Sequence, residues 1–345
     1  PAPIISSSPA NIQSNEGANS SSYRSSSNKG NGSQQNKPSS NGQNSTANSQ
    51  TPSEENNTPK PTRAPAPETP SNPGEEVLTV TMNGSVVSGT ATQILSQIVA
   101  IEMTSNWNRE ALKAQAVATH SWLEFQYAQG NSAPAVNGRS SPSQSVVNAV
   151  SQVANVVMQY NGSYVNAVYT ASAAGYTNPA SQVWGQNYAY LQTVESKYDY
   201  LASNYEKTYT ISAEKMKEII EQSVSVNLDL ENAANWFSVA DYTDGGYIRR
   251  LHIGDATTYV ASNGNTRNIT GYWFVNDIIA KGGVYLRSHA MDISYADGNF
   301  TIVTRGYGHG VGLSQWGAQL YASYEGWNYQ QILSHYYSGV TFTAK

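Results

Sequence analysis

The first 76 residues contain no Leu, Val, Met, Phe or Trp, and Tyr23 is their only aromatic residue. They also hold most of the chain's 14 prolines, and much of the remainder is Ser, Asn, Thr and Gln. A segment of this kind buries too little apolar surface to offset the entropy lost on ordering. The sequence therefore predicts a disordered Ser/Asn/Pro-rich stalk or linker over residues 1–76 and one folded domain over residues 77–345.

Charge and cysteine content exclude several classes of function. Only 12% of the residues are charged and the formal net charge is −5, which cannot supply the broad basic surface of a nucleic-acid-binding protein. The absence of Cys excludes disulfides, iron–sulfur clusters, zinc fingers and a thiol nucleophile. No apolar run approaches the roughly 18 residues of a membrane span. Because the chain starts at Pro1, we expect that a leader was removed or was never included.

Tyr and Trp, at 24 and 7 residues, far outnumber the 5 Phe. Their rings have an apolar body and a polar edge, which suits stacking on sugars. The alternative is that these side chains replace charge on the surface of a secreted protein. Together with the stalk, this composition is typical of a surface protein of a Gram-positive bacterium.

The hydrophobic periodicity of residues 77–345 is mixed. An apolar stripe predicts a helix over residues 91–103, and Ser105 or Asn106 can cap a second helix over residues 108–129. Residues 131–145 are expected to form a loop. Asn161-Gly162 predicts a hairpin between residues 156–160 and 164–169. Further strands are predicted over 77–82, 247–253, 290–294 and 300–304, and further helices over 212–222, 314–324 and 329–336. This order favours the α+β class over a regular βαβ alternation.

Glu102 is the most informative single residue. It ends the apolar stripe that contains Leu95, Ile98 and Val99. A carboxyl group in such a place is partly desolvated, which raises its pKa and suits general-acid cleavage of an ether-like bond. The alternative is that Glu102 lies at the end of the stripe and simply reaches solvent.

Residues 304–318 form a glycine-rich segment in which Gly306, Gly308, Gly310 and Gly312 alternate with larger residues. In an extended chain this pattern makes one bare backbone face, which a ligand or a helix can approach closely. The segment has neither the register of a dinucleotide-binding loop nor the lysine of a phosphate-binding loop. Its His309 is either a catalytic or substrate-binding residue or a residue that holds the backbone by hydrogen bonds.

Other catalytic constellations are absent from the sequence. The five histidines are scattered, with no H-E-x-x-H motif, so we expect no metal site. No G-x-S-x-G motif accompanies the serines. We expect no cofactor.

Several stretches resemble one known family. Ile101-Glu102-Met103, followed by Glu110-Ala-Leu-Lys-Ala-Gln-Ala-Val-Ala118, resembles the "EMP…EALKAQAVAARTYA" signature of the stage II sporulation protein D (SpoIID/LytB) family. Residues 306–318 are similar to its "GHGVGMSQWGA" segment. Residues 169–185 resemble its "SSGGxT…VW" segment, and residues 332–339 resemble its "ILxHYYPG" ending. The motifs occur in the family's order over about residues 90–340.

The family includes lytic transglycosylases of the bacterial cell wall, with the Glu of the first motif as catalytic acid. The resemblance implies that Glu102 protonates the glycosidic oxygen between N-acetylmuramic acid and N-acetylglucosamine. The C6 hydroxyl of the muramic acid then closes on C1 and gives a 1,6-anhydro end. Since the substrate supplies the nucleophile, no second acid is needed, unlike in most glycosidases. The implied fold is a SpoIID-like arrangement of helices and antiparallel strands around one groove.

The motif positions also imply substrate contacts by Lys113, Gln115, His120, Ser172, His309 and Gln315. His120 departs from the family, because it stands where the signature has Arg, and Thr104 replaces the Pro after Glu-Met. The zinc site that some relatives build from Cys and His cannot be copied in a chain without Cys.

The expected partner is therefore a peptidoglycan glycan strand, in an extracellular or wall-associated setting in a Gram-positive spore-forming bacterium. An alternative is a non-catalytic, glycan-binding enhancer of an N-acetylmuramoyl-L-alanine amidase, since some family members are described as amidase enhancers. A third reading is an adhesin or structural wall protein. Retention of Glu102 favours the enzyme, and His120 in place of Arg favours the other two.

Overall fold

The structure, a computed structural model, describes residues 74–203 and 205–345. All but the last three residues of the predicted stalk lie outside the described residues, so the stalk and the domain boundary at residue 76 stay predictions. The described residues mix helices with mostly antiparallel strands, which confirms the α+β class. Within them, every helix falls short of the length and apolar character that crossing a bilayer demands.

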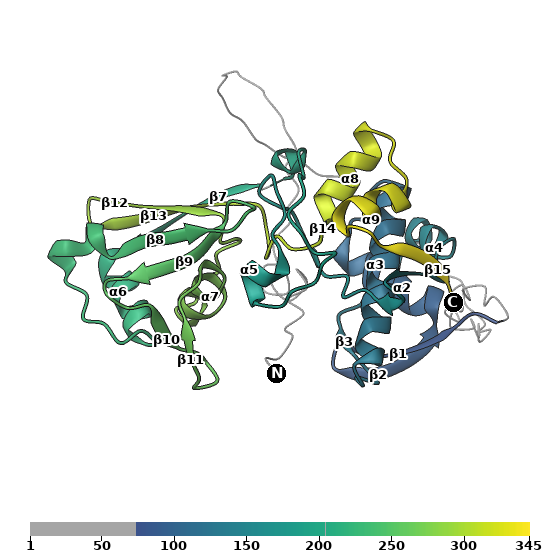
Figure 1. The fold of residues 1–345 in the computed structure, drawn as a ribbon, viewed down its shortest axis with the longest axis horizontal. Coiled ribbons are helices and arrows are strands. Elements are labelled where there is room, and N and C mark those ends of the chain that lie inside the picture. The colour runs from purple at the N-terminus through teal and green to yellow at the C-terminus, as the bar shows by residue number, and fades with distance from the viewer. Residues whose placement is uncertain (1–73, 204) are drawn as a thin grey trace, which may run out of the picture. The chain divides into compact units, whose positions relative to one another are not determined.

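The buried apolar side chains form two clusters, here called the first and second core. The first core begins with the elements coloured blue to teal in Figure 1. They are β1 (Val77–Met82), β2 (Ser85–Thr90), α2 (Ala91–Glu102), α3 (Arg109–Ala128), β3 (Ala135–Val136), α4 (Gln144–Val150), β4 (Val156–Tyr160), β5 (Ser163–Tyr164), β6 (Tyr169–Thr170), α5 (Ala180–Trp184) and the 3₁₀ turn η1 (Asp199–Leu201).

The second core is built from the next hundred residues, coloured green in Figure 1. Strand β13 lies between β12 and β7 in an antiparallel sheet, and β8 pairs with β9. The elements are β7 (Glu206–Ser212), α6 (Ala213–Glu221), η2 (Leu230–Asn235), β8 (Phe237–Tyr242), β9 (Ile248–Ile253), β10 (Thr258–Val260), β11 (Thr266–Asn268), α7 (Gly271–Trp273), the π-helix η3 (Phe274–Ile279), β12 (Met291–Ala296) and β13 (Asn299–Arg305).

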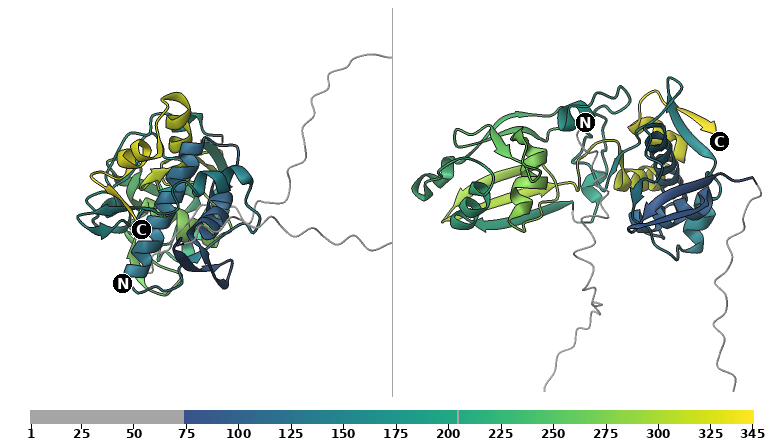
Figure 2. Two further views of the ribbon diagram at one scale, coloured as in Figure 1. Left: turned by 90° about the vertical axis from the view of Figure 1, so that its right-hand side faces the viewer. Right: turned by 90° about the horizontal axis from the view of Figure 1, so that it is seen from below.

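The chain then returns to the first core with β14 (Leu313–Ser314), α8 (Gln315–Tyr324), α9 (Tyr329–Tyr336) and β15 (Thr341–Ala344). Strand β14 runs parallel to β6, and β15 runs antiparallel to β4. Figures 1 and 2 show these yellow elements beside the blue ones, and α8 and α9 pack on α3. The last residues of the sequence therefore complete a core that the first described residues begin.

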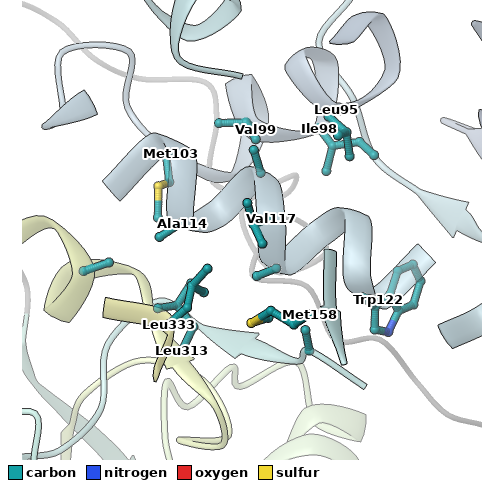
Figure 3. Packing of buried hydrophobic residues seen from close by; sticks show 14 of the residues in the cluster. Leu95, Ile98, Val99, Met103, Ala114, Val117, Trp122, Met158, Leu313 and Leu333 are labelled. Atoms are coloured by element: carbon teal, nitrogen blue, oxygen red, sulfur yellow. The ribbon is translucent and has the colours of Figure 1, made fainter. Parts of the chain in front are cut away.

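Helices α2 and α3 form the centre of the first core. Thr90 caps α2, because its side chain accepts a hydrogen bond from the backbone N–H of Gln93, whose side chain accepts from Thr90 in turn. Leu95, Ile98 and Val99 of the predicted stripe are all buried, and Figure 3 shows them facing the inside of the core. Both helices were predicted within two residues of their bounds.

Three local predictions are corrected. The cap of α3 is Asn108, whose Oδ1 accepts from the backbone N–H of Glu110, and not Ser105 or Asn106. The end of the predicted loop over residues 131–145 instead begins helix α4. The second arm of the hairpin is shorter than predicted. Only Ser163–Tyr164 pairs with β4, and Tyr169, the predicted end of the arm, pairs with Leu313 instead.

Candidate functional site

Glu102 is the last residue of α2, and its side chain is partly buried. Val99 lies one turn before it in the core, and the following Met103 is buried. Figure 3 shows the side chain of Met103 directed toward Ala114 of α3. The buried residues on both sides of Glu102 therefore fix the helix end that carries its carboxylate.

Gln315 reaches Glu102 from a distant segment of the chain, and Gln115 contacts Gln315. Gln315 Nε2 lies 3.3 Å from Glu102 Oε2 and 3.3 Å from Gln115 Oε1, so the two amide hydrogens have two acceptors. Gln115 Nε2 in turn donates to Thr119 Oγ1 over 3.1 Å. Both glutamines are buried. We call Glu102, Gln115 and Gln315 the amide site, since the Gln315 amide hydrogen-bonds to both of the other side chains.

Two tryptophans lie near residues of this site in the sequence, Trp107 after Glu102 and Trp316 after Gln315. Trp316 comes directly after Gln315, and its ring centroid lies 4.9 Å from that of Trp107. Neither side chain is fully buried. A tilted tryptophan pair that is not fully buried is the kind of surface on which a sugar ring can stack.

Lys113, a predicted substrate contact, is already paired. Its Nζ lies 2.8 Å from Glu110 Oε1 and 6.0 Å from the centre of the Tyr329 ring. Glu110 Oε2 also accepts the backbone N–H of Tyr329 at the start of α9. This contact set joins α3 to α9, and a role of Lys113 in substrate binding stays a prediction.

Ser172 and His309 belong to two segments that are joined by hydrogen bonds, and both residues contact mainly backbone atoms. Ser172 exchanges two backbone hydrogen bonds with Tyr307, of 3.1 and 2.9 Å. His309 Nδ1 accepts the backbone N–H of Val311 over 3.0 Å, and its ring lies 4.8 Å from that of Trp184. Burial lowers the pKa of His309 to about 4, so the imidazole is neutral above pH 5. These contacts are those of the backbone-holding alternative for His309.

The glycine-rich segment is not extended, which corrects the expectation of one bare face. Gly306, Gly308, Gly310 and Gly312 all have positive φ, between 70° and 110°. A Cβ added at Gly312 would lie 2.1 Å from the backbone oxygen of Val168. The close approach predicted from the glycines therefore occurs, but to atoms of the protein itself. Gly306 and Gly312 meet backbone of residues 168–173, whereas Gly308 meets the Thr170 side chain and Gly310 the Tyr247 ring.

Comparison with known proteins places this geometry in a family. Residues 85–225 match the family model described as stage II sporulation protein, SpoIID. This segment belongs to the stage II sporulation protein D family. The matched segment contains Glu102, Lys113, Gln115, His120 and Ser172, and Gln315 reaches the site from outside it.

Three curated relatives have similar sequences. An amidase enhancer of Bacillus subtilis (strain 168) is 27% identical over 296 residues, which cover 72% of this chain and 40% of that protein. Stage II sporulation protein D of the same strain is 26% identical over 284 residues, 75% of this chain and 76% of that protein. Stage II sporulation protein D of Bacillus amyloliquefaciens is 26% identical over 308 residues, 82% and 83% of the two chains. This SpoIID-family chain thus spans well under half of the amidase enhancer.

His120 lies elsewhere on α3 in this SpoIID-family chain. Its Nε2 lies 3.3 Å from Glu76 Oε2 and 4.0 Å from Glu124 Oε1, and the side chain has no exposed surface. Lys345 Nζ completes the group at 3.1 Å from Glu76 Oε1 and 2.6 Å from Glu124 Oε2. We call these four residues the lysine cluster. Substrate binding by His120 stays a prediction, and its burial gives that prediction no support.

Sequence reasoning did not anticipate the lysine cluster. Ligand atoms of Glu76, His120 and Glu124 lie within 4.8 Å of one another, a spacing that suits a metal ion. The ammonium group of Lys345 already lies on both carboxylates, so the cluster contains its own cation. Burial lowers the pKa of Lys345, but the hydrogen bonds to both carboxylates outweigh it and raise the pKa. The residues therefore fit a structural ion-pair group better than a metal centre.

A small cavity also lies beside His309, lined among others by Thr170, Asn276, Arg287 and His289. His289 is buried, its Nε2 has no hydrogen-bond partner, and burial together with His309 lowers its pKa to about 3. Both imidazoles are neutral at physiological pH. The cavity offers uncharged nitrogen atoms, and Glu102 is not among its lining residues.

Proposed function

We propose that this SpoIID-family chain is a peptidoglycan lytic transglycosylase in which Glu102 is the general acid and then the general base. The observation that carries the proposal is the amide site. Three motif residues, from α2, α3 and the start of α8, form one hydrogen-bonded group that contains a partly buried carboxylate. A carboxylate oriented by neutral amides can hold or release a proton, which both halves of the reaction require.

The proposed reaction uses one carboxyl group twice. Glu102 donates its proton to the glycosidic oxygen as the bond from that oxygen to C1 of N-acetylmuramic acid breaks. The C6 hydroxyl of the same sugar then forms the new bond to C1 and returns its proton to the Glu102 carboxylate. The products are a free N-acetylglucosamine end and a 1,6-anhydro end, and the enzyme is regenerated without water or cofactor.

Gln315 has a distinct task in this scheme. Its amide donates to Glu102 Oε2 and so orients the carboxylate that is proposed to act on the glycosidic bond. Gln115 accepts the second hydrogen of the same amide and thereby fixes the amide orientation. The Trp107–Trp316 pair supplies a stacking surface beside the acid.

A second candidate function is supported by one comparison. A curated relative is called an amidase enhancer, although the match covers 40% of that protein. In that role the chain binds glycan strands and stimulates a cell-wall amidase without cutting. The burial of His120 and the pairing of Lys113 with Glu110 fit a protein with fewer substrate contacts than the motifs imply.

Either function places the chain at a bacterial cell wall, outside the cell membrane. The curated relatives from Bacillus support a Gram-positive host. The low charge and abundant Tyr fit a neutral glycan ligand.

The deciding experiment is digestion of glycan strands, with and without stem peptides, followed by mass spectrometry of the products. We expect the wild-type chain to release 1,6-anhydromuramic ends. Glu102→Gln should lower the rate by at least about 100-fold, because the amide cannot donate a carboxylic proton. Glu218→Gln, on the exposed face of α6, is the matched control and should cut at the wild-type rate. If the wild type binds strands and cuts none, the non-catalytic enhancer becomes the function to pursue.

A further inference from the structure

A buried aspartate outside every motif contacts two motif segments. Asp199, in η1, has no exposed surface. Its Oδ2 accepts the backbone N–H of Ala173 and, over 2.7 Å, the hydroxyl of Ser314. Ala173 follows Ser172, and Ser314 precedes Gln315. One carboxylate thus holds the segments that carry two predicted site residues.

The contact with Ser314 leads directly to the amide site. Ser314 Oγ donates to Asp199 and accepts the backbone N–H of Gly317 over 3.0 Å, so the same hydroxyl caps α8. The next side chain, Gln315, donates to Glu102 and Gln115. A shift of Ser314 therefore moves the amide that orients the Glu102 carboxylate.

Gly317 shows that this packing is tight. A Cβ at that position would lie 1.9 Å from the hydroxyl of Tyr336, 2.6 Å from Ser196 Oγ and 3.0 Å from Asp199 Oδ1. Real Cβ atoms do not approach so closely. The glycine is needed because α8 begins against the group of polar atoms around Asp199.

From this geometry we propose that Asp199 is a positioning residue that fixes the Ser314–Gln315 turn, and through it the orientation of the Glu102 carboxylate. The inference rests on the proposed function for its activity readout. Asp199 touches no reacting atom, so its effect passes through Ser314 and Gln315.

The ionisation of Asp199 supports this role. Burial raises its pKa to about 7, although the hydrogen bonds from Ser314 and Ala173 act in the opposite direction. Both contacts donate to Oδ2, so the ionised carboxylate holds them more strongly than the protonated acid. The contacts should therefore strengthen as the pH rises through about 7.

The other titratable groups that interact with Asp199 are tyrosines, namely Tyr205, Tyr247, Tyr321 and Tyr336. Burial raises the pKa of each above its ordinary value, so all four stay neutral near pH 7. His289 and His309 have pKa values of about 3 and about 4. Among these described groups, Asp199 alone changes charge near neutral pH.

The first test compares the pH dependence of kcat for the wild type, Asp199→Asn and Ser314→Ala. We expect a wild-type rise in kcat with an apparent pKa near 7. Asp199→Asn should lose this rise and lower kcat about 10- to 100-fold with little change in KM, because small misplacements of catalytic groups have effects of this order. Ser314→Ala should act similarly, and the double variant should be no worse than either single one. Asp297→Asn, in the exposed β12–β13 turn, is the matched control.

The second test does not depend on cleavage. The side-chain amide resonance of Gln315, identified by its loss in Gln315→Ala, is followed by NMR between pH 5 and 9. We expect it to titrate near pH 7 in the wild type and not in Asp199→Asn. If Asp199→Asn does not fold, Ser314→Ala replaces it and should likewise abolish the titration of the Gln315 resonance. Ser314→Thr keeps the hydroxyl and should restore the titration.

The proposal would be overturned if the chemical shift of the Gln315 side chain did not change with pH in the wild type. It would also be overturned if Asp199→Asn kept the wild-type pH dependence of kcat. If the wild type shows the titration and cuts no glycan, the proposed function fails while the link from Asp199 to Gln315 stands.

Discussion

Helix α3 takes part in two groups of acidic and polar side chains that differ in the charge of their partners. In the amide site, Glu102 meets the neutral amide of Gln315. In the lysine cluster, Glu76 and Glu124 meet the ammonium of Lys345. An opposite charge stabilises the ionised carboxylate and opposes protonation, whereas an amide leaves both states accessible. On this comparison, the proton transfer that we propose for Glu102 belongs to the amide site, and we expect the lysine cluster to stabilise the fold.

Removing the cation should give the largest effect on stability. Lys345→Ala leaves the carboxylates of Glu76 and Glu124 beside each other without their ammonium partner. We expect a loss of about 2 kcal/mol in the free energy of unfolding, because the buried carboxylate of Glu124 loses a charged hydrogen-bond partner. Urea denaturation measures it. The exposed pair Lys215–Glu218 supplies the control, since Lys215→Ala should cost at most about 0.5 kcal/mol. Equal losses in the two variants would remove the distinction between the lysine cluster and a surface ion pair.

Removing the amide should spare stability and reduce activity. Gln315→Ala takes away the donor to Glu102 Oε2 and leaves no charge unpaired. We expect a 10- to 100-fold lower cleavage rate, about 1.4 to 2.7 kcal/mol in the activation barrier, because the carboxylate loses its orientation. Glycan digestion and urea denaturation of the same sample measure both quantities. A variant that cuts normally would show that the amide site does not orient the acid.

The smallest expected effect is the pH dependence of the stability that Glu76 contributes through the lysine cluster. The hydrogen bond from His120, followed by contacts with Lys345, lowers the pKa of Glu76 below its ordinary value of 4.5, against the effect of burial. The ionised form therefore stabilises the fold above pH 4.5, and this contribution is lost as the pH falls through the lowered pKa. Glu76→Gln should be less stable than the wild type by at most about 1 kcal/mol at pH 7 and equally stable near pH 3. A difference that persists at pH 3 would mean that Glu76 acts by packing.

Local patterns in the sequence predicted the parts of the fold that depend on near neighbours. The stripe of Leu95, Ile98 and Val99 placed α2 correctly, because helical burial repeats every three to four residues. The conformation of the glycine-rich segment was predicted incorrectly, because alternating glycines suggest an extended chain. The positive φ at Gly312 occurs where the chain passes close to the backbone of Val168, which is distant in the sequence. The hairpin prediction was wrong at Tyr169 for the same reason, because its partner Leu313 is distant in the sequence.

The site residues were likewise predicted from local motifs, whereas the contacts between distant residues were not. The motifs identified Glu102, Gln115 and Gln315, which the structure brings together. The same motifs grouped His120 with them, and the structure places it in the lysine cluster. Nothing in the sequence marked Asp199 as a site residue. Its burial and its hydrogen bonds from Ala173 and Ser314 become visible only in the tertiary structure.

The sequence by itself determined that residues 77–345 are of the α+β class, that an acid ends the first apolar helix, and that the chain carries motifs similar to those of the stage II sporulation protein D family. The tertiary structure decided what each acid meets. Gln315 and Glu102 are 213 positions apart, and Lys345 and Glu124 are 221 apart. The charge state of a carboxyl group depends on the groups within a few ångströms of it, and folding alone brings those groups together.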